Sequence, residues 1–98
     1  MYVIKQNENG TDRIAWKGNP EGLVRSLRSD SIQAYPLLQS ISLYEDTYFN
    51  SWQIGRLVGE LEDFANKIAD GKNRDELHDL IEFSKTVDLQ EHLVFVGD

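Results

Sequence analysis

One amphipathic pattern, from Asn50 to Gly71, constrains the fold of this 98-residue chain more than any other part of its sequence. Its apolar residues recur at the three- and four-residue spacing of a helix face that packs on a core. They are Ile54, Leu57, Val58, Leu61, Phe64, Ala65 and Ile68. Asn50 and Gln53 match a capping box, in which each side chain satisfies the other residue's backbone N–H. The pattern therefore predicts one long helix that begins after Asn50 and ends near Asp70-Gly71.

The two ends of the chain have the character of strands. Tyr2–Lys5 and Arg13–Trp16 are short apolar and aromatic runs, and the Asn9-Gly10 pair between them is a strong hairpin signal because both positions tolerate positive φ. Near the C-terminus, Glu91–Gly97 holds four consecutive apolar residues, which is typical of a strand buried on both faces. We expect this strand to lie beside the N-terminal hairpin.

Further helix signals lie between these strands. Asn19-Pro20 is typical of a helix start and predicts a helix to about Ser29. A helical turn near Tyr35–Gln39 should follow, and then a packed loop. A second capping box, Asn73–Glu76, predicts a helix that ends near Thr86 or Val87.

Length and composition fit one domain over residues 1–98. A chain of this length buries roughly 65% of its unfolded surface in a single core, and its hydrophobic content of 40% is that of a globular protein. The predicted fold class is α+β, with a small antiparallel sheet, made of the N-terminal β-hairpin and the C-terminal strand, packed by two to three helices.

Charge and composition exclude several functional classes. The net charge of −7 argues against binding to nucleic acid, which requires a basic patch. The chain has no cysteine, and no apolar run approaches the roughly 20 residues that cross a bilayer. Its first residues lack the basic and apolar regions of a signal peptide. We therefore expect a cytoplasmic protein without a membrane segment.

The residues that usually carry catalysis or bind metals are scarce. The only histidines are His78, on the polar side of its predicted helix, and His92, which begins the C-terminal strand and is expected at a sheet edge. They lie in different elements and lack metal-ligand spacing, and no glycine-rich phosphate loop is present. We expect no enzymatic activity, no cofactor and no metal.

An acidic and aromatic segment is the strongest functional signal. No lysine or arginine occurs between residues 28 and 56, and this gap holds Tyr44, Glu45, Asp46, Tyr48 and Trp52. Carboxylates pair with basic side chains, and aromatic rings attract cations and anchor protein interfaces. The segment therefore predicts binding to a basic surface of another protein.

Structural roles compete with this interpretation. Asp46 is placed where a turn-forming residue is common, and Trp52 either closes one end of the core or stands at an interface. Glu60 and Asp63 continue the negative charge onto the long helix, where they either contribute to the rim of a binding surface or simply form a solvated helix face. Both interpretations stay open for each residue.

The central region and the C-terminus resemble a set of small bacterial proteins. The matching residues are Tyr35, Pro36, Leu38, Ile41, Tyr44, Asp46, Thr47, Phe49, Asn50, Gln53, Leu57, Glu60 and Leu61, together with Val94–Asp98. Several members of that set are regarded as immunity partners of polymorphic or contact-dependent toxins. The tyrosine-tyrosine-proline signature of nuclease-colicin immunity proteins is absent from this sequence.

This resemblance implies an immunity protein that binds a cognate toxin domain and neutralises it by stoichiometric occlusion. The expected contacts are Tyr44, Glu45, Asp46, Tyr48 and Trp52, with Glu60 and Asp63 at the rim. The alternative is a protein-interaction domain that self-associates, for example as a homodimer through the Trp52 end of the long helix.

Overall fold

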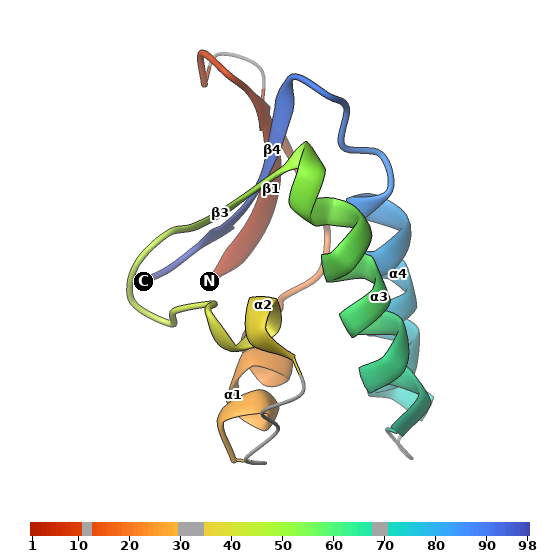
Figure 1. Cartoon of the computed structure of the whole chain (residues 1–98). Helices are drawn as coiled ribbons and strands as arrows, with labels where there is room; N and C mark the ends of the chain where they lie inside the picture. Colours follow the sequence, from red (N-terminus) through yellow and green to blue (C-terminus); the bar gives the residue numbers. More distant parts are fainter. Residues whose placement is uncertain (11–12, 30–34, 68–70) are drawn as a thin grey trace.

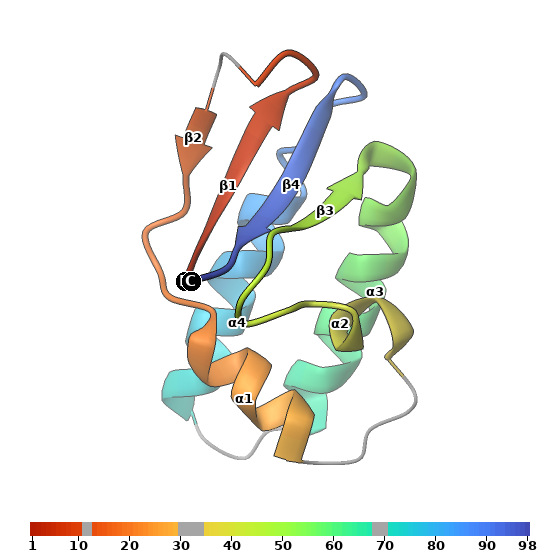
Figure 2. The same ribbon diagram turned by 90° about the vertical axis from the view of Figure 1, so that its left-hand side faces the viewer.

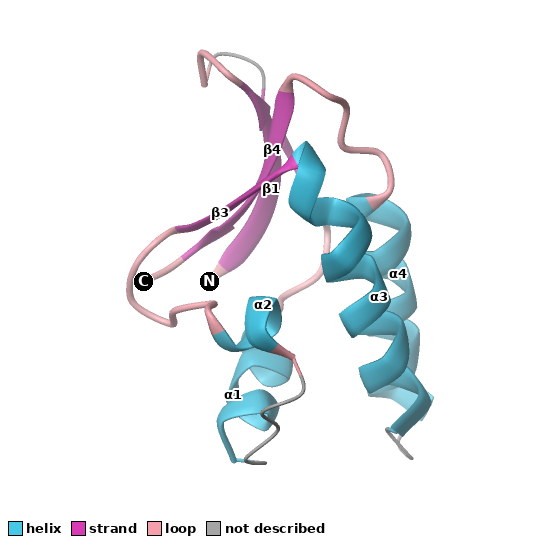
Figure 3. Cartoon of the chain, viewed as in Figure 1, coloured by secondary structure: helices cyan, strands magenta, loops and turns pink. Residues whose placement is uncertain are grey.

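The computed structural model describes residues 1–10, 13–29, 35–67 and 71–98, and its elements form two layers (Figures 1 and 3). The strands are β1 (Tyr2–Asn7), β2 (Arg13–Ala15), β3 (Thr47–Asn50) and β4 (Glu91–Val96). The helices are α1 (Glu21–Ser29), α2 (Pro36–Gln39), α3 (Ser51–Lys67) and α4 (Gly71–Ser84). The predicted α+β class, with an antiparallel sheet packed by helices, is confirmed.

The strands of the described residues form an antiparallel sheet in the order β2-β1-β4-β3. Helices α3 and α4 cover one face of this sheet, and α1 and α2 lie beyond the end at which both chain termini are found (Figure 2). The core between the layers includes Val3, Phe49, Leu57, Leu61, Phe64, Leu80, Leu93 and Phe95. In the described part of the chain, no helix covers the opposite face of the sheet, which we call the outer face.

The prediction for both ends of the chain is confirmed. β1 and β2 form the hairpin, and Gly10 in its turn has φ = +70°, a conformation that glycine adopts without steric cost. β4 pairs with β1 along its full length, and Leu93, Val94 and Phe95 are all buried. A strand with neighbours on both sides and buried residues on both faces explains the continuous apolar run.

Two expectations about the sheet are wrong. The expected packed loop before the long helix ends in a strand, because Thr47–Asn50 pairs with β4. Four residues are too few to show an alternating pattern, and their pairing depends on a strand more than forty residues away. His92 is not at a sheet edge either, since β4 lies between β1 and β3 and His92 pairs with Gln6 and Asn50.

The long helix begins as predicted. The N–H of Gln53 donates to Asn50 Oδ1 at 3.0 Å, and the N–H of Asn50 donates to Gln53 Oε1 at 2.9 Å, which completes the capping box. Asn19 Oδ1 similarly accepts from the N–H of Glu21 at the start of α1. α4 begins at Gly71 rather than after Asn73, so the second capping box does not mark its start. Ile68 and Asp70 lie outside the described residues.

Candidate functional site

Three exposed aromatic side chains follow one edge of the sheet. Tyr44 lies in the loop before β3, Tyr48 lies on β3 and Trp52 lies in the first turn of α3. They are 77%, 54% and 88% exposed, respectively, so none of them serves the core. β3 is an edge strand of the sheet, and we call this set of three residues the aromatic edge. Trp52 therefore does not close one end of the core, because so exposed a side chain contributes little to core packing. Its interpretation as an interface residue remains.

Tyr48 belongs to a small apolar cluster on the outer face. Its neighbour Phe49 points into the core, so the alternation of a strand places Tyr48 on the opposite face. In register with Tyr48 are Val94 on β4 and Ile4 on β1. Val94 and Ile4 are buried although they lie outside the main core cluster. The aromatic edge is therefore continuous with apolar side chains on a face that no described helix covers.

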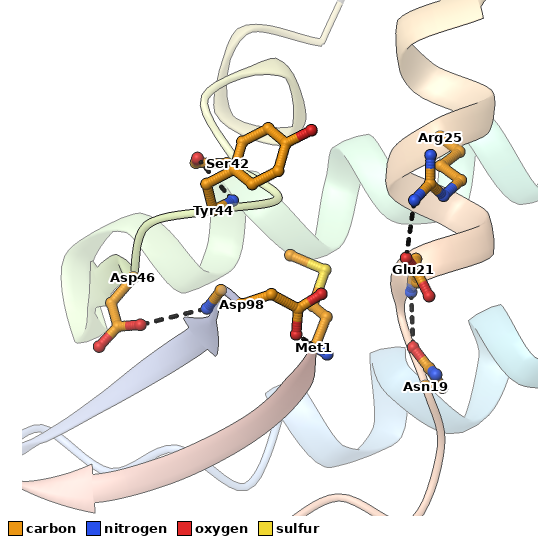
Figure 4. A network of polar contacts seen from close by, with 9 residues as sticks. Met1, Asn19, Glu21, Arg25, Ser42, Tyr44, Asp46 and Asp98 are labelled. Atoms are coloured by element: carbon orange, nitrogen blue, oxygen red, sulfur yellow. Dashed lines mark hydrogen bonds and ion pairs between the residues drawn. The ribbon is translucent and has the colours of Figure 1, made fainter.

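The loop that carries Tyr44 and Glu45 is held by its own hydrogen bonds (Figure 4). Ser42 Oγ accepts from the N–H groups of Tyr44 and Glu45, each at 3.1 Å. The N–H of Ser42 in turn donates to Thr47 Oγ1 at 3.1 Å. Such contacts fix the backbone of a turn before any partner binds. The loop presents the side chains of Tyr44 and Glu45 on an ordered backbone, which lowers the entropic cost of binding.

The end of β4 provides a second support for this loop. The N–H of Gly97 donates to Asp46 Oδ1 at 3.1 Å, and the N–H of Asp98 donates to the carbonyl of Leu43 at 2.9 Å. Asp98 Oδ1 also accepts from the Met1 amino group at 2.8 Å. Asp46 is exposed but has a structural contact, which supports its turn-forming interpretation. Glu45 is exposed, and no ion pair involves it within the described residues.

Gly97 is required by this close approach. A Cβ atom on Gly97 would lie 2.6 Å from the backbone N and O of Glu45, and backbone atoms cannot move aside independently. We expect Gly97→Ala to displace the loop and to lower the free energy of unfolding by about 1–3 kcal/mol. Urea unfolding measures this change. Gly55→Ala on the exposed side of α3 is the matched control, because nothing lies near its added methyl group. Equal effects of the two variants would contradict the prediction.

Glu60 does not lie at an exposed rim, so that expectation is corrected. Its side chain is buried, with 8% of the residue exposed. Glu60 Oε1 accepts from the N–H groups of Leu37 and Leu38 at 3.1 Å each, and Oε2 lies 3.4 Å from the guanidinium of Arg56. The first N–H groups of a helix have no partner within the helix, and here the carboxylate supplies one for α2. Glu60 therefore joins α2 to α3.

Asp63 is also engaged with the segment before α2. It accepts a hydrogen bond from the hydroxyl of buried Tyr35 and lies 3.2 Å from Lys67 Nζ, which is also 5.1 Å from the Tyr35 ring centre. The Tyr35 hydrogen bond, followed by that of Lys67, lowers the pKa of Asp63. Glu60 and Asp63 thus meet the start of α2, and the structure does not bring them to the aromatic edge.

The lowered pKa of Asp63 predicts how stability depends on pH. Its carboxylate stabilises the folded state above the unfolded pKa of about 4, and this contribution is lost as the pH falls through the lower, folded pKa. We expect Asp63→Asn to reduce the loss of stability on acidification below about pH 4. Urea unfolding between pH 2 and 7 tests this, with Glu62→Gln as the exposed control. If the free energy of unfolding depends on pH in the same way for wild type and Asp63→Asn, the contacts of Asp63 with Tyr35 and Lys67 do not favour its charged form.

Leu89 was not identified from the sequence. It is 83% exposed in the turn before β4, and its carbonyl accepts from Ser51 Oγ at 3.2 Å. This contact places the turn beside the first residue of α3, next to Trp52. The only sequence signal is an isolated apolar residue in a polar turn, and single exposed leucines are common.

The described residues contain no group of three or more histidine, cysteine, aspartate or glutamate side chains that could hold a metal ion. His78 is exposed on α4. No helix in the part of the chain that the structure describes is long and apolar enough to span a membrane. Comparison with protein-family models gave no match, and neither curated proteins nor solved structures gave a significant one. The functional argument therefore rests on the surface itself.

Proposed function

We propose that this chain is an immunity-type protein that acts in the cytoplasm by binding a cognate toxin domain and covering its functional surface. The observation that carries the proposal is the aromatic edge, where Tyr44, Tyr48 and Trp52 are exposed on ordered elements beside Glu45. Aromatic side chains are preferred anchors of protein interfaces because they bury a large area at low entropic cost.

Charge supports a basic partner surface. The chain carries a net charge of −7, and Glu45 is exposed without an ion pair among the described residues. A toxin that acts on nucleic acid or nucleotides needs basic residues to hold its substrate, and carboxylates at the rim of an inhibitor would pair with them. Binding by occlusion requires no catalytic group in the inhibitor.

Co-expression of this chain with the product of the neighbouring gene tests the proposed immunity function. We expect that product to arrest growth when expressed alone, and this chain to restore growth and to co-purify with it in a 1:1 complex. A neighbouring product that neither arrests growth nor binds this chain would contradict the proposal.

Glu45→Lys tests the electrostatic part. We expect slower association and an affinity lowered by about tenfold at low salt, with a smaller difference at high salt. The melting temperature should stay unchanged because Glu45 has no ion pair to lose. Surface plasmon resonance at two salt concentrations measures the association and dissociation rates, and their ratio gives the affinity. Glu45 is the informative position, since a change at Asp46 also removes the Gly97 contact. Unchanged association would mean that Glu45 does not face the partner.

Self-association is the second candidate function. Trp52 and Leu89 are strongly exposed and lie at the same end of the molecule, where a symmetric contact could bury both. Sedimentation over a range of concentrations separates the two functions. A monomer that forms a 1:1 heterodimer supports the immunity function, whereas a stable homodimer without affinity for the neighbouring product supports self-association.

A further inference from the structure

A groove runs between β2 and α4, on the side of the molecule opposite the aromatic edge. Its volume is about 600 Å³. Its lining includes Ile14 and Lys17 from β2 and the residues after it, and Glu76, Asp79, Glu82 and Phe83 from α4. Figure 2 shows β2 at the left-hand edge of the sheet, with the upper part of α4 behind β1 and β4.

The strand beside the groove has a free edge. Among the described residues, β2 pairs with β1 only. The N–H of Trp16 donates to the carbonyl of Val3 at 2.8 Å, so this pair and the pair two residues further along exchange hydrogen bonds with β1. In an antiparallel ladder the alternate residues, here Ala15 between these pairs and Arg13 beyond them, direct their backbone groups to the other side. These groups can accept an additional strand.

The wall formed by α4 is acidic. Glu76, Asp79 and Glu82 are spaced three residues apart and are all exposed. Within the described residues, Glu76 and Asp79 have no ion pair, and Glu82 has only an exposed one with Lys85 at 3.6 Å. Ile14 and Phe83 supply apolar surface next to these carboxylates. A lysine or arginine side chain suits such a surface, because its stem packs on apolar atoms while its charge reaches a carboxylate.

We propose that this β2–α4 groove binds an extended segment of a partner protein that carries lysine or arginine at alternate positions and adds to β2 as a fifth strand. Side chains on the inner face of that strand would project over the groove toward α4. A second copy of this chain is disfavoured, because symmetric pairing of two β2 strands would bring two acidic α4 helices together. This inference does not depend on the immunity function or on the aromatic edge.

The test uses an eight-residue peptide of alternating lysine and valine with the full chain, followed by amide chemical shifts in NMR titrations. We expect shifts centred on Arg13–Ala15 and on the groove wall of α4, and increased protection of the Ala15 amide from hydrogen exchange. The same peptide with N-methyl groups on alternate residues keeps its side chains and charge but lacks half of its backbone donors. Two such peptides are possible, one N-methylated on its lysines and the other on its valines. We expect one of the two to bind at least tenfold more weakly than the unmodified peptide, because its N-methyl groups replace the donors that face β2.

Variants of the protein test whether the carboxylates of α4 contribute to binding of the peptide. We expect Glu76→Gln combined with Asp79→Asn to weaken binding of the unmodified peptide by about tenfold, from two ion pairs of up to roughly fivefold each. Glu45→Gln combined with Asp46→Asn removes the same charge from the loop before β3, at the opposite edge of the sheet, keeps an acceptor oxygen for the Gly97 N–H, and should have little effect. Equal weakening by both double variants, or equal binding of all peptides, would overturn the proposal in favour of non-specific attraction between a basic peptide and an acidic protein.

Discussion

Replacing Trp52 with alanine should weaken binding of the partner protein by at least 30-fold, which corresponds to about 2 kcal/mol at a central aromatic anchor. The indole is 88% exposed, so its removal takes almost no packing from the folded chain. Alanine also has the higher helix propensity at this position in the first turn of α3. The melting temperature should therefore stay within about 2 °C of wild type, a shift of a few tenths of a kcal/mol. Isothermal titration calorimetry and thermal unfolding together measure the two quantities.

A matched control comes from the opposite edge of the sheet. Ile14 is a large apolar residue that is also exposed, but it lies on β2, and Ile14→Ala should leave binding at the aromatic edge unchanged. Tyr48→Ala should resemble Trp52→Ala, since both side chains belong to the same surface. If Ile14→Ala abolishes binding and Trp52→Ala does not, the partner occupies the β2–α4 groove instead.

Replacing Glu60 with alanine should destabilise the fold more than any other single carboxylate substitution on α3. The change leaves the part-buried N–H of Leu37 and the buried N–H of Leu38 without their acceptor, and the loss for a fully buried group costs on the order of 1–3 kcal/mol. We expect the free energy of unfolding to fall by about 2–4 kcal/mol. In a domain of this length, each kcal/mol lowers the melting temperature by about 4–8 °C.

Glu62→Ala is the control for this measurement. Glu62 lies on the same helix, but it is half exposed and only 3.8 Å from Lys85 Nζ in an exposed pair, which predicts an effect below about 1 kcal/mol. Glu60→Gln keeps an acceptor oxygen and should recover part of the stability. Urea unfolding of the three variants gives the comparison. Similar losses for Glu60→Ala and Glu62→Ala would mean that the contact with α2 contributes little.

The elements with local signals could be predicted from the sequence. The capping box at Asn50 and Gln53 sets the start of α3, and the Asn9-Gly10 pair marks the hairpin turn, because hydrogen bonds and backbone conformations within a few residues determine both. β3 had no such signal. Its four residues become a strand only because β4 offers a free partner in the sheet.

The candidate functional residues were likewise predictable only in part. The sequence indicated an acidic and aromatic segment without basic residues, and its exposed members are Tyr44, Glu45, Tyr48 and Trp52. It could not separate Glu60 from the exposed carboxylates of α3, since helical spacing does not show that the start of α2 packs against that position. The groove beside β2 was not predicted either, because it arises where two elements that are distant in sequence meet.

The sequence by itself determined the α+β class, the capped helix of the central region, the antiparallel hairpin and the doubly buried C-terminal strand, since each follows from local hydrogen bonding or from the period of apolar residues. Only the tertiary structure decided which polar side chains are available to a partner. Asp46, Glu60 and Asp63 are held by the chain's own N–H and hydroxyl groups, whereas Glu45, Glu76 and Asp79 have no ion pair within the described residues. The physical reason is that a carboxylate's partner is set by what packs beside it in space, and residues distant along the chain supply that partner.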